Sequence, residues 1–206
     1  MVKDINTGGS SQPDLFTVVG STLFFSAYDQ TNGRELWKSD GSESGTTMVT
    51  DVGGSDSFVW SGSSTAGQEG MVALGNSVLF VASEMLADGT LSSYSQLWIS
   101  DGTESGTSLV QDFNPFHSDH PKYMVEIGTS VYFSIDDPVH GRELWVTDGT
   151  ASGTEMLSDL STGGTGADPT NMVGMGGSVF FFADLTNYGR ELCHDQSVIT
   201  SITYSY

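Results

Sequence analysis

The sequence has few basic residues, a single cysteine and no long apolar run. Six lysines and arginines stand against 26 aspartates and glutamates, giving a formal net charge of −20. Such a charge repels phosphate backbones and anionic lipid, so we exclude nucleic-acid binding and electrostatic attachment to membranes. No apolar run is long enough to span a bilayer, which argues against membrane insertion. With Cys193 alone, no internal disulfide can form.

The apolar residues are numerous and regularly spaced. Hydrophobic residues make up 37% of the chain and aromatic residues 11%, enough to bury a core, so we expect a folded protein despite its acidity. A length of 206 residues fits one domain or two small ones. The internal repeat favours a single domain over residues 1–206.

One segment recurs along the chain. Residues 33–46 read GRELWKSDGSESGT, and close copies stand at residues 95–107, 141–154 and, in part, 189–193. Short apolar segments separated by Gly and Asn turns surround each copy. The first unit predicts strands at residues 15–19, 22–28, 34–39 and 47–52. The repeat units lie approximately at residues 14–53, 71–113, 123–160 and 171–206, with loop insertions at 55–70 and 84–95.

A repeated four-stranded antiparallel unit of about 45 residues is typical of a β-propeller blade. One such sheet must bury its apolar faces against its neighbours around an axis. The sequence therefore predicts an all-β propeller of about four blades. A closed four-bladed ring is our first expectation, and an arc of a larger propeller is the alternative.

The two ends of the chain compete to complete the fourth blade. Met1–Ile5 resembles Met48–Val52 and Met156–Leu160, so it is a candidate closing strand for the ring. Alternatively, Ser197–Tyr206 completes that blade, and Met1–Ile5 is the remnant of a preceding one. Because Met1 occupies a repeat position, we expect the sequence to be a stretch of a longer protein.

The repeated motif carries a family resemblance. Glu35-Leu-Trp37, with Asp40-Gly41 and Gly45-Thr46 after it, resembles the ELWxxDGT repeat of predicted secreted and surface proteins, chiefly bacterial. The resemblance covers nearly the whole chain. It implies a repeat-built extracellular protein and no established activity. Our own interpretation places the chain on a secreted, cell-surface or organelle-lumen protein. The departures from the motif are Ser42, Gln96 and Cys193.

The recurrent Asp-Gly loops raise the question of calcium, because hard cations prefer several oxygen ligands. None of the loops has the acidic run of an EF-hand, so we assign no metal site and no cofactor. Each aspartate is instead expected to cap its turn, with glycine supplying the backbone conformation and threonine closing the hairpin. Weak calcium binding through general acidity is the alternative. The aspartates are Asp40, Asp101 and Asp148, and the glycines are Gly41, Gly102 and Gly149.

Arginine and tryptophan each recur at one repeat position. The arginines are expected to bond carboxylates across their hairpins or on a neighbouring blade, and an anion-binding ring is the alternative. The tryptophans are expected in the core because Cys193, a small hydrophobe, takes the fourth position; sugar stacking is the alternative. Trp60, outside the repeat, is the better candidate for an exposed contact. The sets are Arg34, Arg142 and Arg190, preceded by Asp29, Asp137 and Asp184, and Trp37, Trp98 and Trp145.

The histidines and the cysteine give no catalytic set. His117 and His120 would need a further zinc ligand, and His140 and His194 lie at repeat turns, so all are interpreted as surface residues. Cys193, His194 and Asp195 are adjacent on a predicted strand, where neighbours point to opposite faces. We assign no catalytic residues.

These observations predict a non-enzymatic structural or protein–protein interaction and assembly module. Long loops such as residues 55–70 offer binding surfaces. A glycan-binding propeller using Trp60, Tyr94 or Tyr188 is the second hypothesis. An enzyme built at the axis is the third, and it would need carboxylates or histidines converging there with shifted pKa values.

Overall fold

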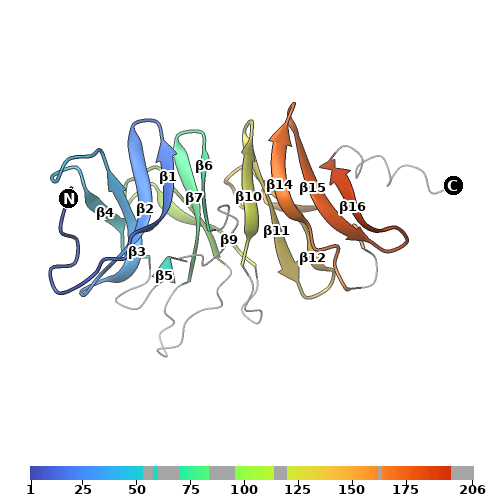
Figure 1. Cartoon of the computed structure of the whole chain (residues 1–206), viewed down its shortest axis with the longest axis horizontal. Coiled ribbons are helices and arrows are strands. Elements are labelled where there is room, and N and C mark those ends of the chain that lie inside the picture. Colours follow the sequence, from blue (N-terminus) through green and yellow to red (C-terminus); the bar gives the residue numbers. More distant parts are fainter. Residues whose placement is uncertain (53–57, 60–69, 84–95, 114–119, 162–163, 196–206) are drawn as a thin grey trace.

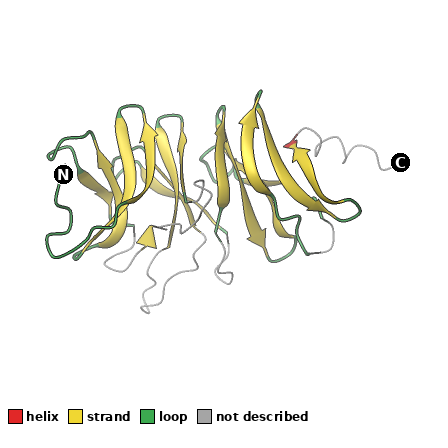
Figure 2. Cartoon of the chain, viewed as in Figure 1, coloured by secondary structure: helices red, strands yellow, loops and turns green. Residues whose placement is uncertain are grey.

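The computed structural model describes residues 1–52, 58–59, 70–83, 96–113, 120–161 and 164–195. Over these residues the protein is built from β-strands, which form four antiparallel sheets side by side along the long axis (Figures 1 and 2). Within the same residues, no helix is long and apolar enough to cross a membrane. The prediction of an all-β protein made of repeated antiparallel units is confirmed.

Each of the first three sheets is a four-stranded meander, and the fourth has three strands among the described residues. The first sheet contains β1 (Asp14–Val19), β2 (Thr22–Asp29), β3 (Gly33–Ser39) and β4 (Thr47–Thr50). The second contains β6 (Met71–Leu74), β7 (Ser77–Ser83), β8 (Gln96–Ser100) and β9 (Thr107–Asp112). The third contains β10 (Lys122–Ile127), β11 (Ser130–Asp137), β12 (Gly141–Thr147) and β13 (Glu155–Ser158). The fourth contains β14 (Thr170–Met175), β15 (Ser178–Leu185) and β16 (Gly189–His194).

A short strand, β5 (Phe58–Val59), links the first two sheets. It pairs in parallel with β3 and antiparallel with β7. The third and fourth sheets have no such link within the described residues, and side-chain packing joins them to their neighbours.

The central hairpin has the same register in every sheet. At its middle, a phenylalanine pairs with the residue at the tryptophan position of the motif, so the two side chains share one face. The pairs are Phe25–Trp37, Phe80–Trp98, Phe133–Trp145 and Phe181–Cys193.

A bulge opens the first strand of three sheets, at a residue with left-handed backbone geometry. Leu15, Tyr123 and Asn171 have φ angles of 58°, 56° and 53°, which non-glycine residues adopt at a cost. The second sheet has Gly70 at this position, with a φ of 89°.

Three hydrophobic clusters lie between successive sheets. Leu36 packs with Met71 and Phe80 between the first two sheets, and Leu97 packs with Met124 and Phe133 between the second and third. Between the third and fourth sheets, the equivalent residues are Leu144, Met172 and Phe181. The second and third sheets are therefore each covered on both faces, one by the sheet before and the other by the sheet after.

The expectation of a closed four-bladed ring is wrong for the described part of the chain. The first and fourth sheets lie at opposite ends of the long axis, and no strand pairing joins them (Figure 1). Met1–Ile5 forms no strand, and Ile5 packs against Phe25, Ala27 and Trp37 of the first sheet. Because that packing holds the segment at the far end from β16, it does not close the ring. The alternative closing segment, residues 197–206, lies outside the described residues.

Candidate functional site

The Asp-Gly loops are closed by their own side chains. Asp40 Oδ1 accepts hydrogen bonds from the backbone N–H and the hydroxyl of Ser42, at 2.8 and 2.7 Å. The hydroxyl of Thr46 donates to the carbonyl of Ser42 at 2.7 Å and shares a second bond with the Ser39 hydroxyl. The loops at Asp101 and Asp148 repeat this network. The prediction that these aspartates cap their turns is confirmed.

Those bonds explain the ionisation of the loop aspartates. Hydrogen bonds from the side chains and backbone of Ser42, Thr103 and Thr150 hold the pKa values of the three carboxyls below their ordinary range. Within the described residues, no three histidine, cysteine, aspartate or glutamate side chains gather as a metal site would require. The loops thus act as hairpin locks that hold the third and fourth strands of a sheet together.

The arginines only partly follow their predicted role. Arg190 forms an ion pair with Asp184 at 2.8 Å, as predicted, and bonds the hydroxyl of Thr170. Arg142 instead donates to the carbonyl and hydroxyl of Ser134, and its Nε lies 3.9 Å from Asp168.

Arg34 is buried and donates to Ser26 and to the carbonyl of Gln12. The predicted pairing with Asp29 and Asp137 is therefore wrong. Those two aspartates accept amide hydrogens from their own turns instead.

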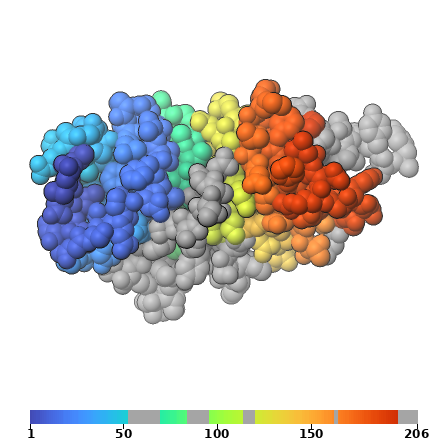
Figure 3. Space-filling model, viewed as in Figure 1, coloured from blue at the N-terminus to red at the C-terminus, as the bar shows by residue number. Residues whose placement is uncertain are grey.

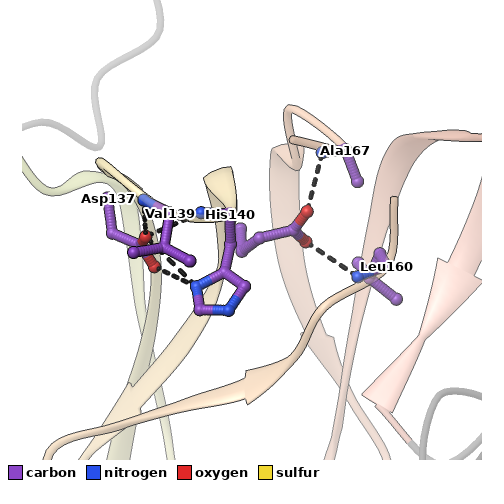
Figure 4. Close-up of polar contacts among 6 residues, drawn as sticks. Asp137, Val139, His140, Leu160 and Ala167 are labelled. Carbon is purple, nitrogen blue, oxygen red and sulfur yellow. Dashed lines mark hydrogen bonds and ion pairs between the residues drawn. The ribbon is translucent and has the colours of Figure 1, made fainter. Parts of the chain in front are cut away.

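Asp137 also binds the ring of His140 (Figure 4). The Nδ1 atom of His140 lies 2.9 Å from Asp137 Oδ2, and this bond raises the pKa of His140. Burial opposes ionisation of Asp137, but the bonds from the His140 backbone and ring lower its pKa overall. The arrangement stabilises the β11–β12 turn.

The tryptophans lie in packing positions, as predicted. Trp98 packs in the cluster between the first and second sheets, and Trp145 packs in the next cluster, with its ring edge-on to Phe113 at 5.4 Å. Trp37 is buried on the outer side of the first sheet. Trp60 and Tyr94 lie outside the described residues.

A buried carboxylate was not identified from the sequence. Glu35 and Glu143 of the motif are completely buried and accept backbone amide hydrogens from the segment that leaves the outermost strand of the sheet. Glu35 binds the amide of Val52 at 3.2 Å. Glu143 binds the amides of Leu160 and Ala167, each at 3.0 Å, and Figure 4 shows these two residues around its carboxylate. The motif glutamate therefore holds the crossing from one sheet to the next.

Burial also changes the acidity of this group. It raises the pKa of Glu143 to about 7, against the lowering effect of the Leu160 and Ala167 amides. In the second sheet Gln96 occupies the position, where its amide bonds Asp112 and Trp98. The recurrence of the motif glutamate could have indicated a buried structural role, since its spacing to Val52 and to Leu160 is the same.

The histidine and cysteine residues do not form a catalytic set among the described residues. Cys193 is buried against the third sheet, where burial raises the pKa of its thiol, whereas His194 lies against Phe180 with ring centroids 5.4 Å apart. The prediction that these neighbours point to opposite faces is confirmed. His120 is buried, so its interpretation as a surface residue is wrong. His117 lies outside the described residues.

The fourth sheet exposes an apolar face. The motif leucine is 0% exposed at Leu36, Leu97 and Leu144, but 64% exposed at Leu192. Around Leu192 lie further exposed apolar side chains of the same sheet, namely Val173, Met175 and Phe182. In the other sheets this face is covered by the next sheet, which the fourth sheet lacks within the described residues.

The first sheet exposes the face that, in the other sheets, packs against the preceding sheet. Phe16 is 62% exposed, whereas its repeat equivalents Met71, Met124 and Met172 are at most 8% exposed. Phe16 stacks on Phe25 with ring centroids 6.0 Å apart, and Val18 beside it is also exposed. The two faces lie at opposite ends of the molecule, with β14–β16 in orange and red and the N-terminal segment in dark blue (Figure 3). Together they are the strongest candidate for a functional surface.

The fold defines a β-propeller-like repeat protein, with antiparallel sheets packed face to face through repeated positions. No protein-family model matches the sequence, and no curated protein matches it. Several solved structures are similar to this chain over most of its length. TolB from Acinetobacter baumannii is 12% identical over 87% of this chain and 44% of its own, with a TM-score of 0.44.

The AtxE2 isopeptidase is 13% identical over 82% of this chain and 24% of its own, with a TM-score of 0.47. An α-L-arabinofuranosidase from Clostridium thermocellum is 12% identical over 94% of this chain and 72% of its own, with a TM-score of 0.34. The chain thus spans less than half of TolB and about a quarter of AtxE2.

Proposed function

We propose that this chain is a non-enzymatic assembly module, an arc of a β-propeller that binds a protein partner through the exposed apolar faces of its end sheets. The observation that carries the proposal is the exposure of Leu192, 64% against 0% at Leu36, Leu97 and Leu144. An apolar patch on a folded protein marks an interaction surface because leaving it in water is unfavourable.

The composition supports the same function. The resemblance to ELWxxDGT repeat proteins and the strongly acidic surface fit a secreted, cell-surface or lumenal protein, and we include that location in the proposal. The titratable groups of the described motif serve the fold: Asp40 caps its loop, Glu143 holds a crossing segment and the thiol of Cys193 is buried.

Native purification with mass spectrometry tests the proposal. A protein partner should co-purify in fixed proportion with the wild-type chain and be lost with Leu192→Asp, while Val139→Asp retains it. Val139 is a suitable control because it is equally exposed but lies in the β11–β12 turn, away from both end faces. Purification of the wild-type chain as a monomer without a partner would contradict the proposal.

Glycan binding is the second candidate function. The observation in its favour is Tyr188, which is 76% exposed in the turn between β15 and β16. Aromatic rings on exposed turns can stack on the apolar faces of sugars. A glycan array tests it, with Tyr188→Ala as the control variant, and an array without reproducible binding would remove this candidate.

A further inference from the structure

The two exposed end faces are the two halves of one recurring junction. At each of the three junctions within the chain, the motif leucine of one sheet packs against a methionine and a phenylalanine of the next. The fourth sheet exposes the leucine half at Leu192. The first sheet exposes the other half at Phe16, which stacks on the buried ring of Phe25. Because the halves come from the same repeat, the fourth sheet of one molecule is complementary to the first sheet of another.

The N-terminal segment adds a second complementary feature. Met1–Ile5 resembles Met48–Val52, which contains β4, the outermost strand of the first sheet. Val52 packs in the cluster that includes Phe80, Ala82 and Trp98 of the following sheet. Ile5 packs on the equivalent residues of the first sheet, Phe25, Ala27 and Trp37. The segment therefore lies against the first sheet as the outermost strand of a preceding sheet would.

Among the described residues, the fourth sheet lacks the outer strand that the first and third sheets have. β16 has β15 on one side and no described strand on the other, whereas β3 and β12 each pair with an outer strand. Glu191 is exposed there, although Glu35 and Glu143 are buried under the segment that follows the outer strand. The first residues of the N-terminal segment are also exposed, since Met1 is 105% and Val2 50% exposed.

From these relationships we infer that two copies of this chain associate head to tail. The fourth sheet of one copy packs on the first sheet of the next, and Met1–Ile5 of the second copy pairs with β16 as its fourth strand. The inference rests on the proposed assembly function and names its partner, a second copy.

The register of the new pairing follows from the repeat. Trp37 pairs with Met48, and Leu36 pairs with Thr50. The equivalent pairs are Cys193 with Met1 and Leu192 with Lys3. The carboxylate of Glu191 then accepts the amide hydrogen of Ile5, as Glu35 accepts that of Val52.

Such a contact joins two different faces, so it either closes into a ring or continues into a longer assembly. The four described sheets of two copies would make eight blades, a number within the range that propellers adopt. Each copy carries a net charge of −20, so repulsion opposes association at low salt. We therefore expect added salt to strengthen the dimer, because its interface is apolar.

Sedimentation velocity of the purified chain alone tests the inference. The wild type should form a dimer whose dissociation constant falls with added salt. Leu192→Asp on the fourth sheet and Phe16→Asp on the first should each weaken association by at least roughly 10- to 100-fold, the effect of losing one buried apolar side chain. Val139→Asp, on neither end face, should leave it unchanged.

Mixing the two variants gives a sharper result. The Leu192→Asp chain retains the unchanged apolar face of the first sheet. The Phe16→Asp chain retains the unchanged apolar face of the fourth sheet. The mixture should therefore form a heterodimer through one intact junction, and it should associate more strongly than either variant alone. Circular dichroism of each variant checks that it remains folded.

A disulfide tests the register. With Cys193→Ser, the double variant Lys3→Cys and Leu192→Cys should oxidise between chains, because paired residues of adjacent strands are close enough for a disulfide. Each single-cysteine variant is the control. A disulfide formed within one chain would overturn the inference.

The outcomes separate this inference from the proposed function. A monomer at all salt concentrations, or a dimer insensitive to both face variants, overturns the head-to-tail pairing. If a different protein still co-purifies through Leu192, the proposed function stands without it. If neither a second copy nor any other partner binds, both fail.

Discussion

The carboxylate of Glu143 accepts the backbone amide hydrogen of Leu160 at 3.0 Å, completely buried between two sheets. Glu35 makes the same bond to Val52 in the first sheet. A buried carboxylate costs free energy unless donors compensate it, and here the donors belong to the segment that crosses to the next sheet. In the first and third sheets, the glutamate of the repeat thus fixes where the sheet leads into the following one.

Replacing Glu143 by glutamine should remove part of the pH dependence of stability. Burial raises the folded-state pKa to about 7, above the ordinary value of 4.5, so the folded chain holds this proton more tightly than the unfolded chain. The resulting stabilisation is fully present below about pH 4.5 and is lost as the pH rises through about 7. Between these limits we expect Glu143→Gln to gain on the order of 3 kcal/mol relative to wild type.

Urea unfolding at about pH 5 and about pH 8 measures this difference. Glu155→Gln is the matched control, because Glu155 is an exposed glutamate of the same sheet. The control should follow the wild type at both pH values. If the free-energy difference between Glu143→Gln and wild type is equal at both pH values, the pKa of Glu143 is not raised by folding.

The Asp148 loop should not tolerate a side chain at Gly153. A Cβ atom added there would lie 2.1 Å from Asp148 Oδ1, which holds the Thr150 amide and hydroxyl. Gly153→Ala should therefore displace the carboxylate and lower the free energy of unfolding by roughly 1–3 kcal/mol. Thermal unfolding measures the loss, with Ser152→Ala as the control. Equal stability of the two variants would argue against the loop as a hairpin lock.

The bulge at Asn171 should discriminate between glycine and a β-branched residue. Its φ of 53° suits asparagine and glycine but not valine. We expect Asn171→Gly to change the free energy of unfolding by less than about 0.5 kcal/mol, and Asn171→Val to lower it by roughly 1–3 kcal/mol. Denaturant unfolding of the Asn171→Gly and Asn171→Val variants measures the two free energies. A valine variant as stable as the glycine variant would contradict the strained bulge.

Much of the fold was accessible from the sequence because the repeat reports the same local structure several times. Alternating apolar segments with Gly turns predicted the strands, and Cys193 at the tryptophan position indicated a packing role for Trp98 and Trp145. These are properties of one unit, in which near neighbours along the chain determine the contacts.

The closure of the ring and the partners of the arginines were not accessible. Whether Met1–Ile5 reaches β16 depends on the angles between sheets summed along the chain, which no single repeat encodes. Arg34 lies beside Asp29 in the hairpin, yet it bonds Gln12 and Ser26 because competing turn amides occupy the aspartate. The burial of Glu143 likewise depends on a segment 17 residues later in the chain.

One pair of truncations tests the central claim, that successive sheets bury each other and leave the end faces free. Leu144 and Leu192 occupy the same motif position, but they are 0% and 64% exposed. In the dilute monomer, Leu144→Ala should lower the free energy of unfolding by about 2–5 kcal/mol, and Leu192→Ala by less than about 0.5 kcal/mol. Equal losses for the two variants, measured by urea unfolding, would contradict the account.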